Sequence, residues 1–231
     1  MSEDQKPGAG DLIDAAAVGL LAIQAAVAVC VYSLGPTGPI ATHFDFHGRP
    51  NGWGDRTELA IGIAVLGAVS LLINLMLRQG VFTGGLGNSR RTNAVARGLI
   101  VGLTALLTAL IASLAFAHGG GLGEQRLPLT LAMLMFVVVG AFVGKAAPNA
   151  FIGVRVYWTL RSRLAWDKAN RLLGRIFFFG GLIGVLAMPF VDLDHDIVLV
   201  MAWLLIVVVG GGLLAIIESW RVWRTDPERT P

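Results

Sequence analysis

The sequence predicts an all-α, polytopic integral membrane protein, built as a bundle of six transmembrane helices. Three observations lead to this prediction: a high mean hydropathy of +0.71, six long apolar runs, and an uneven distribution of basic residues between the connections. Only 14% of the residues are charged, whereas soluble domains contain about 25%. A soluble globular protein is therefore excluded.

The six apolar runs supply the transmembrane helices. A helix needs about 20 apolar residues to cross the hydrocarbon core of a bilayer. The runs that meet this requirement lie at residues 12–34, 59–77, 95–117, 127–147, 172–190 and 197–217. We expect two domains, residues 1–78 with two spans and residues 79–231 with four spans.

The basic residues predict the orientation of the bundle. With six spans, the N-terminus, the second and fourth connections and the tail share one side of the membrane and hold 15 Lys and Arg. The first, third and fifth connections hold only three, Arg49, Arg56 and Arg126. Cytoplasmic loops carry the excess of Lys and Arg, so both termini are expected in the cytoplasm and all four histidines outside it. We expect the protein in a cell membrane, with the lipid bilayer as its partner and no direct contact with nucleic acid.

The first outer connection contains a candidate metal cluster. Residues 42–46 alternate as a strand does, and side chains on a strand project to one face with period two. His43, Asp45 and His47 would then share a face as two nitrogen ligands and one oxygen ligand. The alternative is that these residues cap helix ends and bond loop backbone, with Trp53 as an anchor in the interface.

The fourth connection is long and basic. From Ser162 onward its apolar residues recur every three to four positions, which predicts an amphipathic cytoplasmic helix leading into the fifth span. Its basic residues would pair with anionic headgroups while Trp158 and Trp166 sit at the membrane boundary. A protein-docking role is the alternative.

The chemistry of the apolar runs and loops argues against an enzyme or a carrier. The runs contain no ionisable residue away from their ends, and ion-coupled carriers generally need one at depth. A passive channel or transporter would need a polar line through the bundle, and a metal-dependent membrane enzyme would need the outer histidines to converge. No nucleophile elbow, phosphate-binding loop or zinc-protease pattern is present. We therefore expect no catalytic residue and no cofactor.

Two motifs resemble a known family. The pattern Pro-x-x-x-His43-Phe-x-x-x-Gly48-x-Pro50-x-x-Trp53 resembles a small domain of unknown function that commonly opens proteins of the bacterial SdpI immunity protein family. The family's C-terminal signature is similar to Pro148-Asn149-x-Phe151-Ile152-Gly153-x-Arg155-x-x-Trp158-Thr159-Leu160, followed by Trp166, Arg171 and Gly174. The chain departs from the family at Val156-Tyr157, where Thr-Pro is usual, and at Ala169-Asn170, where Thr-His is usual.

The resemblance implies a function and a set of site residues. It implies a non-enzymatic protein of the bacterial cytoplasmic membrane that protects its cell against a secreted peptide toxin. In the best-known member of the family, the protein also captures a cytoplasmic transcriptional repressor. The implied ligand-binding or motif residues are His43, Gly48, Pro50 and Trp53 outside, and Asn149, Gly153, Arg155, Trp158, Trp166 and Arg171 inside.

Overall fold

The computed structural model describes residues 9–79, 90–116, 125–146, 148 and 152–229. Six of its helical segments are long and apolar enough to cross a membrane. They are α1 (Ala9–Leu34), α2 (Arg56–Arg78), α3 (Arg90–Ala115), α4 (Arg126–Val143), α6 (Arg163–Ala187) and the rod Leu193–Thr225. The prediction of a six-span helical membrane protein is confirmed.

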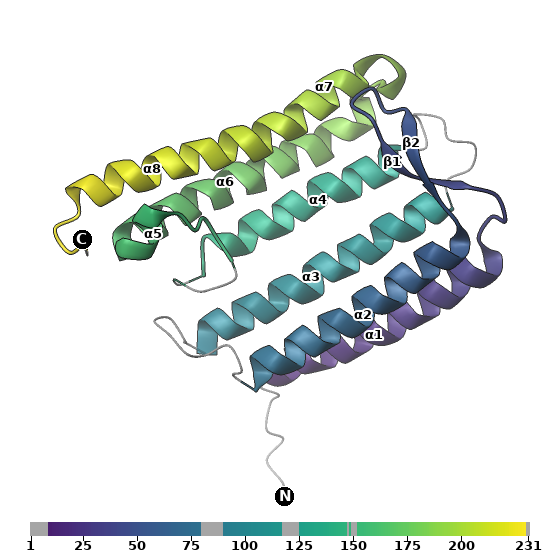
Figure 1. The fold of residues 1–231 in the computed structure, drawn as a ribbon, viewed down its shortest axis with the longest axis horizontal. Helices are drawn as coiled ribbons and strands as arrows, with labels where there is room; N and C mark the ends of the chain where they lie inside the picture. The colour runs from purple at the N-terminus through teal and green to yellow at the C-terminus, as the bar shows by residue number, and fades with distance from the viewer. Residues whose placement is uncertain (1–8, 80–89, 117–124, 147, 149–151, 230–231) are drawn as a thin grey trace, which may run out of the picture.

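The spans lie side by side in chain order, from α1 and α2 to the last rod (Figure 1). This rod comprises α7 (Leu193–Leu205), the π-helical turn η3 (Ile206–Gly210) and α8 (Gly211–Thr225). Bulky apolar side chains such as Val18, Ile61 and Leu186 are about 60% exposed on the outside of the bundle. Such a surface is expected where lipid, rather than water, surrounds the helices.

The two ends of the bundle differ in structure. One end, here called the hairpin end, contains the strands β1 (Ile40–Phe44) and β2 (Pro50–Gly54), paired antiparallel, and the turn between α6 and α7. The other, here called the corner end, contains the short helix α5 (Tyr157–Arg161), the start of α6 and the end of α8 (Figure 1). The start of α1 and the end of α8 both lie at the corner end.

Small residues allow α4 and α6 to pack closely. A Cβ atom built on Gly174 would lie 2.9 Å from the carbonyl oxygen of Gly140, and one on Gly181 would lie 2.6 Å from that of Met133. Close backbone approach of this kind is the usual way in which helices associate in lipid.

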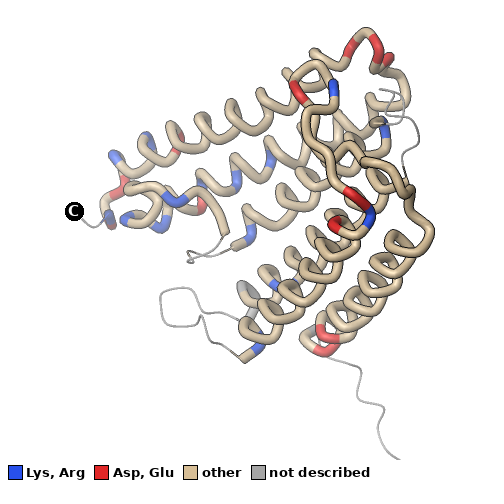
Figure 2. The backbone as a smooth tube through the Cα atoms, turned by 45° about the vertical axis from the view of Figure 1, so that its right-hand side comes forward, with Lys and Arg blue, Asp and Glu red and all other residues tan. Residues whose placement is uncertain are grey.

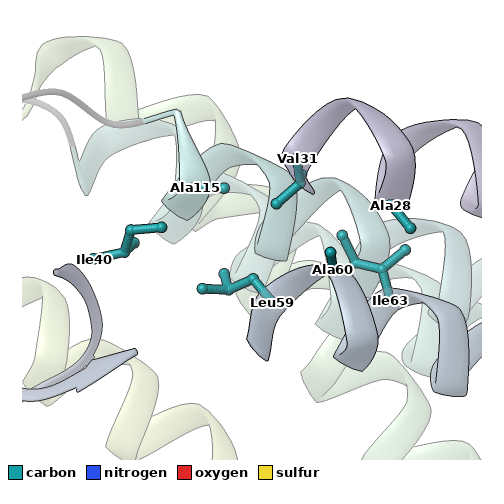
Figure 3. Close-up of a cluster of buried hydrophobic side chains, with 7 residues drawn as sticks. All are labelled: Ala28, Val31, Ile40, Leu59, Ala60, Ile63 and Ala115. Carbon is teal, nitrogen blue, oxygen red and sulfur yellow. The ribbon is translucent and has the colours of Figure 1, made fainter. Parts of the chain in front are cut away.

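An apolar cluster joins the hairpin to the first three helices. Ile40 of β1 is 5% exposed and packs with side chains from α1, α2 and α3 (Figure 3). The members of the cluster are Ala28, Val31, Ile40, Leu59, Ala60, Ile63 and Ala115. The hairpin is therefore fixed to the bundle through its first strand.

Hydrogen bonds cross the predicted domain boundary at residues 78 and 79. Gln24 of α1 donates to Thr108 of α3 at 3.0 Å, and Ser70 of α2 lies 3.1 Å from Thr104 of α3. Thus α3 is bonded to both helices of the predicted N-terminal domain, and the two-domain division stays a prediction.

The amphipathic helix predicted from Ser162 onward, leading into the fifth span, is the start of α6. The amphipathic stretch forms the first turns of α6, continuous with the fifth span. Ser162 begins this helix as its N-cap, because its hydroxyl accepts from the backbone N–H of Ala165 at 2.9 Å. The distinct short helix before it is α5.

Candidate functional site

The hairpin places the first set of predicted residues. His43 Nδ1 bonds to the side-chain oxygen of Asn51 on the opposite strand. Gly48 takes a positive φ of 73° in the turn, which favours glycine. Pro50 begins β2, and Trp53 is 59% exposed on it.

The predicted metal cluster of His43, Asp45 and His47 does not form. The strand ends at Phe44, and the chain then turns around Asp45, whose carboxylate accepts from the backbone N–H groups of His47 at 2.8 Å and Arg49 at 2.9 Å. The period-two alternation therefore stops before His47. Within the described residues, no group of three or more His, Cys, Asp and Glu is placed to hold a metal ion.

The turn also lowers the pKa of Asp45. The backbone N–H of Arg49, followed by that of His47, holds the pKa of Asp45 below its ordinary value, because both bonds favour the ionised carboxylate. This carboxylate serves the turn as a backbone acceptor.

His195, at the start of α7, bonds within its own turn. His195 bonds to Asp192 at 2.9 Å, and Asp192 is the N-cap of α7. His118 lies outside the described residues. The acidic turn before α7 is therefore a capped helix start.

Two neighbouring residues at the start of α4 connect the parts of the hairpin end. Gln125, 7% exposed, donates to the carbonyl oxygen of Gly48 in the hairpin turn at 2.9 Å. Arg126 donates to the carbonyl oxygens of Met188 and of Val191, the second at 2.9 Å. One helix end thus holds both the hairpin and the α6–α7 turn.

The corner end holds the second set of predicted residues around Asn170. The side-chain oxygen of Asn170, which is 1% exposed, accepts from the backbone N–H of Val154 at 2.7 Å. Gly153 has a positive φ of 117°, and a Cβ atom on it would press against the Asn170 carboxamide and lie 3.2 Å from the Trp166 ring. Only glycine fits this turn without strain.

Trp166 is buried, so its predicted position at the membrane boundary is wrong. It is 0% exposed, and its indole N–H donates to the carbonyl oxygen of Ala146 at 2.9 Å. A buried indole needs such an acceptor, and the chain just beyond the end of α4 supplies it. Trp166 therefore fastens the fourth connection to the start of α6.

Two further contacts close the corner. The Thr159 hydroxyl donates to the carbonyl oxygen of Val154 at 2.8 Å and accepts from the N–H of Val156 at 3.0 Å. The Ser162 hydroxyl donates to the buried carboxylate of Asp226, just after α8. This hydrogen bond lowers the pKa of Asp226 from its ordinary value. The tail beyond the last span is thereby joined to the corner.

The other predicted inner residues lie on the surface of this corner. Arg155 and Arg171 are exposed and Trp158 is half-buried, while Asn149 lies outside the described residues. Sequence reasoning missed the roles of Gln125, Asn170 and Asp226. Asn170 was visible only as a departure from the family pattern, and nothing in the sequence pairs Gln125 or Asp226 with its distant partner.

A polar line runs along part of the first three helices. It begins at the corner end with Arg97, which bonds to Asp14 and, at 3.1 Å, to Asn74. It continues through the Ser70–Thr104 and Gln24–Thr108 pairs. In the described helices this line ends at the buried apolar cluster beneath the hairpin, which Figure 3 shows.

The comparisons with known proteins match both motif-bearing regions. Residues 145–218 match the SdpI/YfhL protein family, and residues 19–68 match the Domain of unknown function (DUF1648). No curated protein and no solved structure matches the chain at a significant level. The first region contains α5, α6, α7 and about half of α8, and the second contains most of α1, the hairpin and about half of α2. The C-terminal part of the chain therefore matches the SdpI/YfhL family and its N-terminal part matches DUF1648, in a multi-pass membrane protein.

Proposed function

We propose that this chain is an immunity-type protein of the bacterial cytoplasmic membrane that protects its cell against a secreted peptide toxin by binding rather than by catalysis. The match to the SdpI/YfhL family supports the immunity role. In this proposal the hairpin end captures the toxin outside the cell. The corner end offers a docking face in the cytoplasm, where a transcriptional repressor is the proposed partner.

The observation that carries the proposal is the ordered corner. The region that matches the family contains a glycine turn that Asn170 and Trp166 hold in place, with Arg155 exposed two residues after Gly153. A segment that served only to attach the chain to lipid would need basic charge and apolar area. It would not need a turn that only glycine can form.

The hairpin end supports the proposed toxin site. Trp53, Phe46 and Phe190 are 59%, 45% and 88% exposed there. Exposed apolar side chains at an end of the bundle suit contact with an apolar or amphipathic peptide. Gln125 and Arg126 hold the loops that carry them, so the surface is pre-formed.

The excess of basic residues supports the proposed orientation. The connections at the corner end and the chain termini hold 15 of the 18 Lys and Arg. Figure 2 shows basic residues gathered around α5, α6 and the end of α8, while acidic residues lie at both ends of the bundle. By the positive-inside rule the corner end faces the cytoplasm.

A protection assay tests the proposed function. A strain that lacks this gene should lose viability in cell-free medium taken from a culture of its parent strain. Reintroduction of the wild-type gene should restore viability. Complementation with Arg155→Lys should fail. A guanidinium can bind a carboxylate through two parallel hydrogen bonds in one plane, and the ammonium group of lysine cannot. Arg163→Lys, an exposed site of the same charge at the start of α6, should protect fully, with both variants equally abundant in the membrane.

Two results would count against this function. Equal survival of the deletion strain and its parent in that medium would remove the immunity role. Equal protection by Arg155→Lys and Arg163→Lys would reduce the corner to a basic lipid anchor.

A further inference from the structure

Exposed aromatic side chains and carboxylates occur together at the hairpin end. Phe46, Trp53 and Phe190 are 45%, 59% and 88% exposed, and each lies within two positions of an aspartate. The hairpin turn and the α6–α7 turn lie side by side (Figures 1 and 2). The adjacent residues Gln125 and Arg126 bond to these two turns. One end of the molecule thus presents apolar rings and acidic groups together.

The described part of the hairpin end contains twice as many carboxylates as arginines. The carboxylates are those of Asp45, Asp55, Glu58, Asp192, Asp194 and Asp196, and the arginines are Arg49, Arg56 and Arg126. Arg56 and Arg126 donate to backbone carbonyl oxygens. Among the described residues, none of these six carboxylates forms an ion pair with an arginine or a lysine. The described part of this end therefore has a net negative charge.

The hydrogen bonds of these carboxylates leave their negative charge in place. Asp45, Asp55 and Asp192 accept from backbone N–H groups, which are neutral. Such bonds hold the pKa of Asp45 below its ordinary value, so it stays ionised at neutral pH. In the first turn of α7, Asp194 is exposed and Asp196 is half-buried, and neither carboxylate bonds to another described residue. The negative charge is therefore available to a ligand.

We propose that the hairpin end binds a peptide that is both cationic and amphipathic, an inference that rests on the proposed capture of a toxin there. The basic side chains of such a peptide pair with the carboxylates and lie over the exposed aromatic rings, which attract cations. Its apolar side chains contact the same rings. A neutral peptide would meet the rings but would gain nothing from the carboxylates, and an acidic peptide would be repelled.

The binding of two synthetic peptides tests this inference. One is a helical peptide with a leucine face and a lysine face, and the other has glutamine in place of every lysine. Each is titrated against the purified full-length protein in phosphatidylcholine nanodiscs, with protein-free nanodiscs as the blank. Wild type should bind the lysine peptide about tenfold more tightly than the glutamine peptide, and about 0.5 M NaCl should remove most of this preference, because salt screens exposed charges.

Substitutions at the two ends of the bundle locate the binding surface. Asp194→Asn with Asp196→Asn should weaken binding of the lysine peptide by about fivefold for each carboxylate removed, the effect of one pair of charges about 4 Å apart in water. Trp53→Ala should weaken binding of both peptides, because both lose a ring contact. Asp167→Asn with Glu228→Gln is the matched control, because it removes the same charge from one half-buried and one exposed site at the corner end. This control should bind both peptides as wild type does.

The natural toxin gives a second test. The activity in the medium of the parent strain that kills the strain lacking this gene should be retained on a cation exchanger at neutral pH. Three results would overturn the inference: equal affinity of wild type for the two peptides, equal weakening in the control variant, or killing activity that passes the exchanger unretained. The peptide titrations need no natural toxin, so the charge preference of the hairpin end and the immunity role fail separately.

Discussion

Gly153→Ala is expected to disrupt the corner end and abolish protection against the toxin. The glycine has a φ of 117°, and forcing another residue into such a region costs about 1–3 kcal/mol. The added Cβ would also displace the Asn170 carboxamide, so that the N–H of Val154 loses its acceptor. The purified variant should unfold several degrees below wild type in a thermal denaturation series, and cells that carry it should be as sensitive as the deletion strain.

Gly62→Ala is the control for this change. A Cβ on Gly62 meets nothing within 4 Å, and alanine favours a helix over glycine by about 1 kcal/mol. Gly62→Ala should therefore be neutral or slightly stabilising. If Gly153→Ala behaved like Gly62→Ala in both assays, the corner would not depend on the tight turn.

Arg97→Ala is expected to produce the largest loss of stability in the first three helices. The Arg97 side chain is 8% exposed and holds Asp14 of α1 and Asn74 of α2 from α3. Disrupting a buried ion pair costs about 3 kcal/mol or more. Arg97→Ala would leave the buried side-chain oxygen of Asn74 without this donor and Asp14 paired with the exposed Arg78 alone. Thermal unfolding of the purified protein, followed by helical circular dichroism, should show this loss.

Arg78→Ala is the control for Arg97→Ala, because it removes the same charge from an exposed position. Arg78 pairs with the same Asp14 carboxylate at 3.2 Å, but its side chain is 58% exposed. An exposed pair contributes about 0–1 kcal/mol, so this variant should remain close to wild type. Equal losses of stability for Arg97→Ala and Arg78→Ala would show that the contribution of each arginine does not depend on its burial.

The membrane architecture follows from the sequence because hydrophobic length is a local property. The predicted runs 12–34 and 59–77 fall within α1 and α2 and differ from their ends by three residues at most. The lipid-facing side of each helix must be apolar whatever its neighbours are. Span detection therefore does not require knowledge of the packing.

The wrong predictions arose where one sequence pattern is compatible with two different local structures. Trp166 suits either an interfacial anchor or a buried hydrogen-bonded indole, and the carbonyl of Ala146, 20 residues away, decided in favour of burial. The alternation of His43, Asp45 and His47 suits a strand, but Asp45 is a strong turn former and bonded to the backbone instead. In both cases a hydrogen bond to a backbone group, which the periodicity of side chains does not take into account, determined the result.

The residues that hold the candidate sites together were beyond sequence reasoning. Gln125 bonds across 77 positions to Gly48, and Ser162 bonds across 64 positions to Asp226. Neither pair shows a periodicity or a motif. The glycine at position 153 was identified from the family pattern, but the reason for it, the Asn170 carboxamide, required the fold.

The measurement that tests the account most directly is the sidedness of the two ends, because toxin capture and cytoplasmic docking both depend on it. In a Cys30→Ala background, single cysteines at His47, Asp194 and Arg163 would be exposed in intact cells to a membrane-impermeant thiol reagent. Positions 47 and 194 lie at the hairpin end and position 163 at the corner end. The account predicts labelling at 47 and 194, and labelling at 163 only after the cells are opened. Labelling of position 163 in intact cells, with 47 and 194 protected, would contradict it.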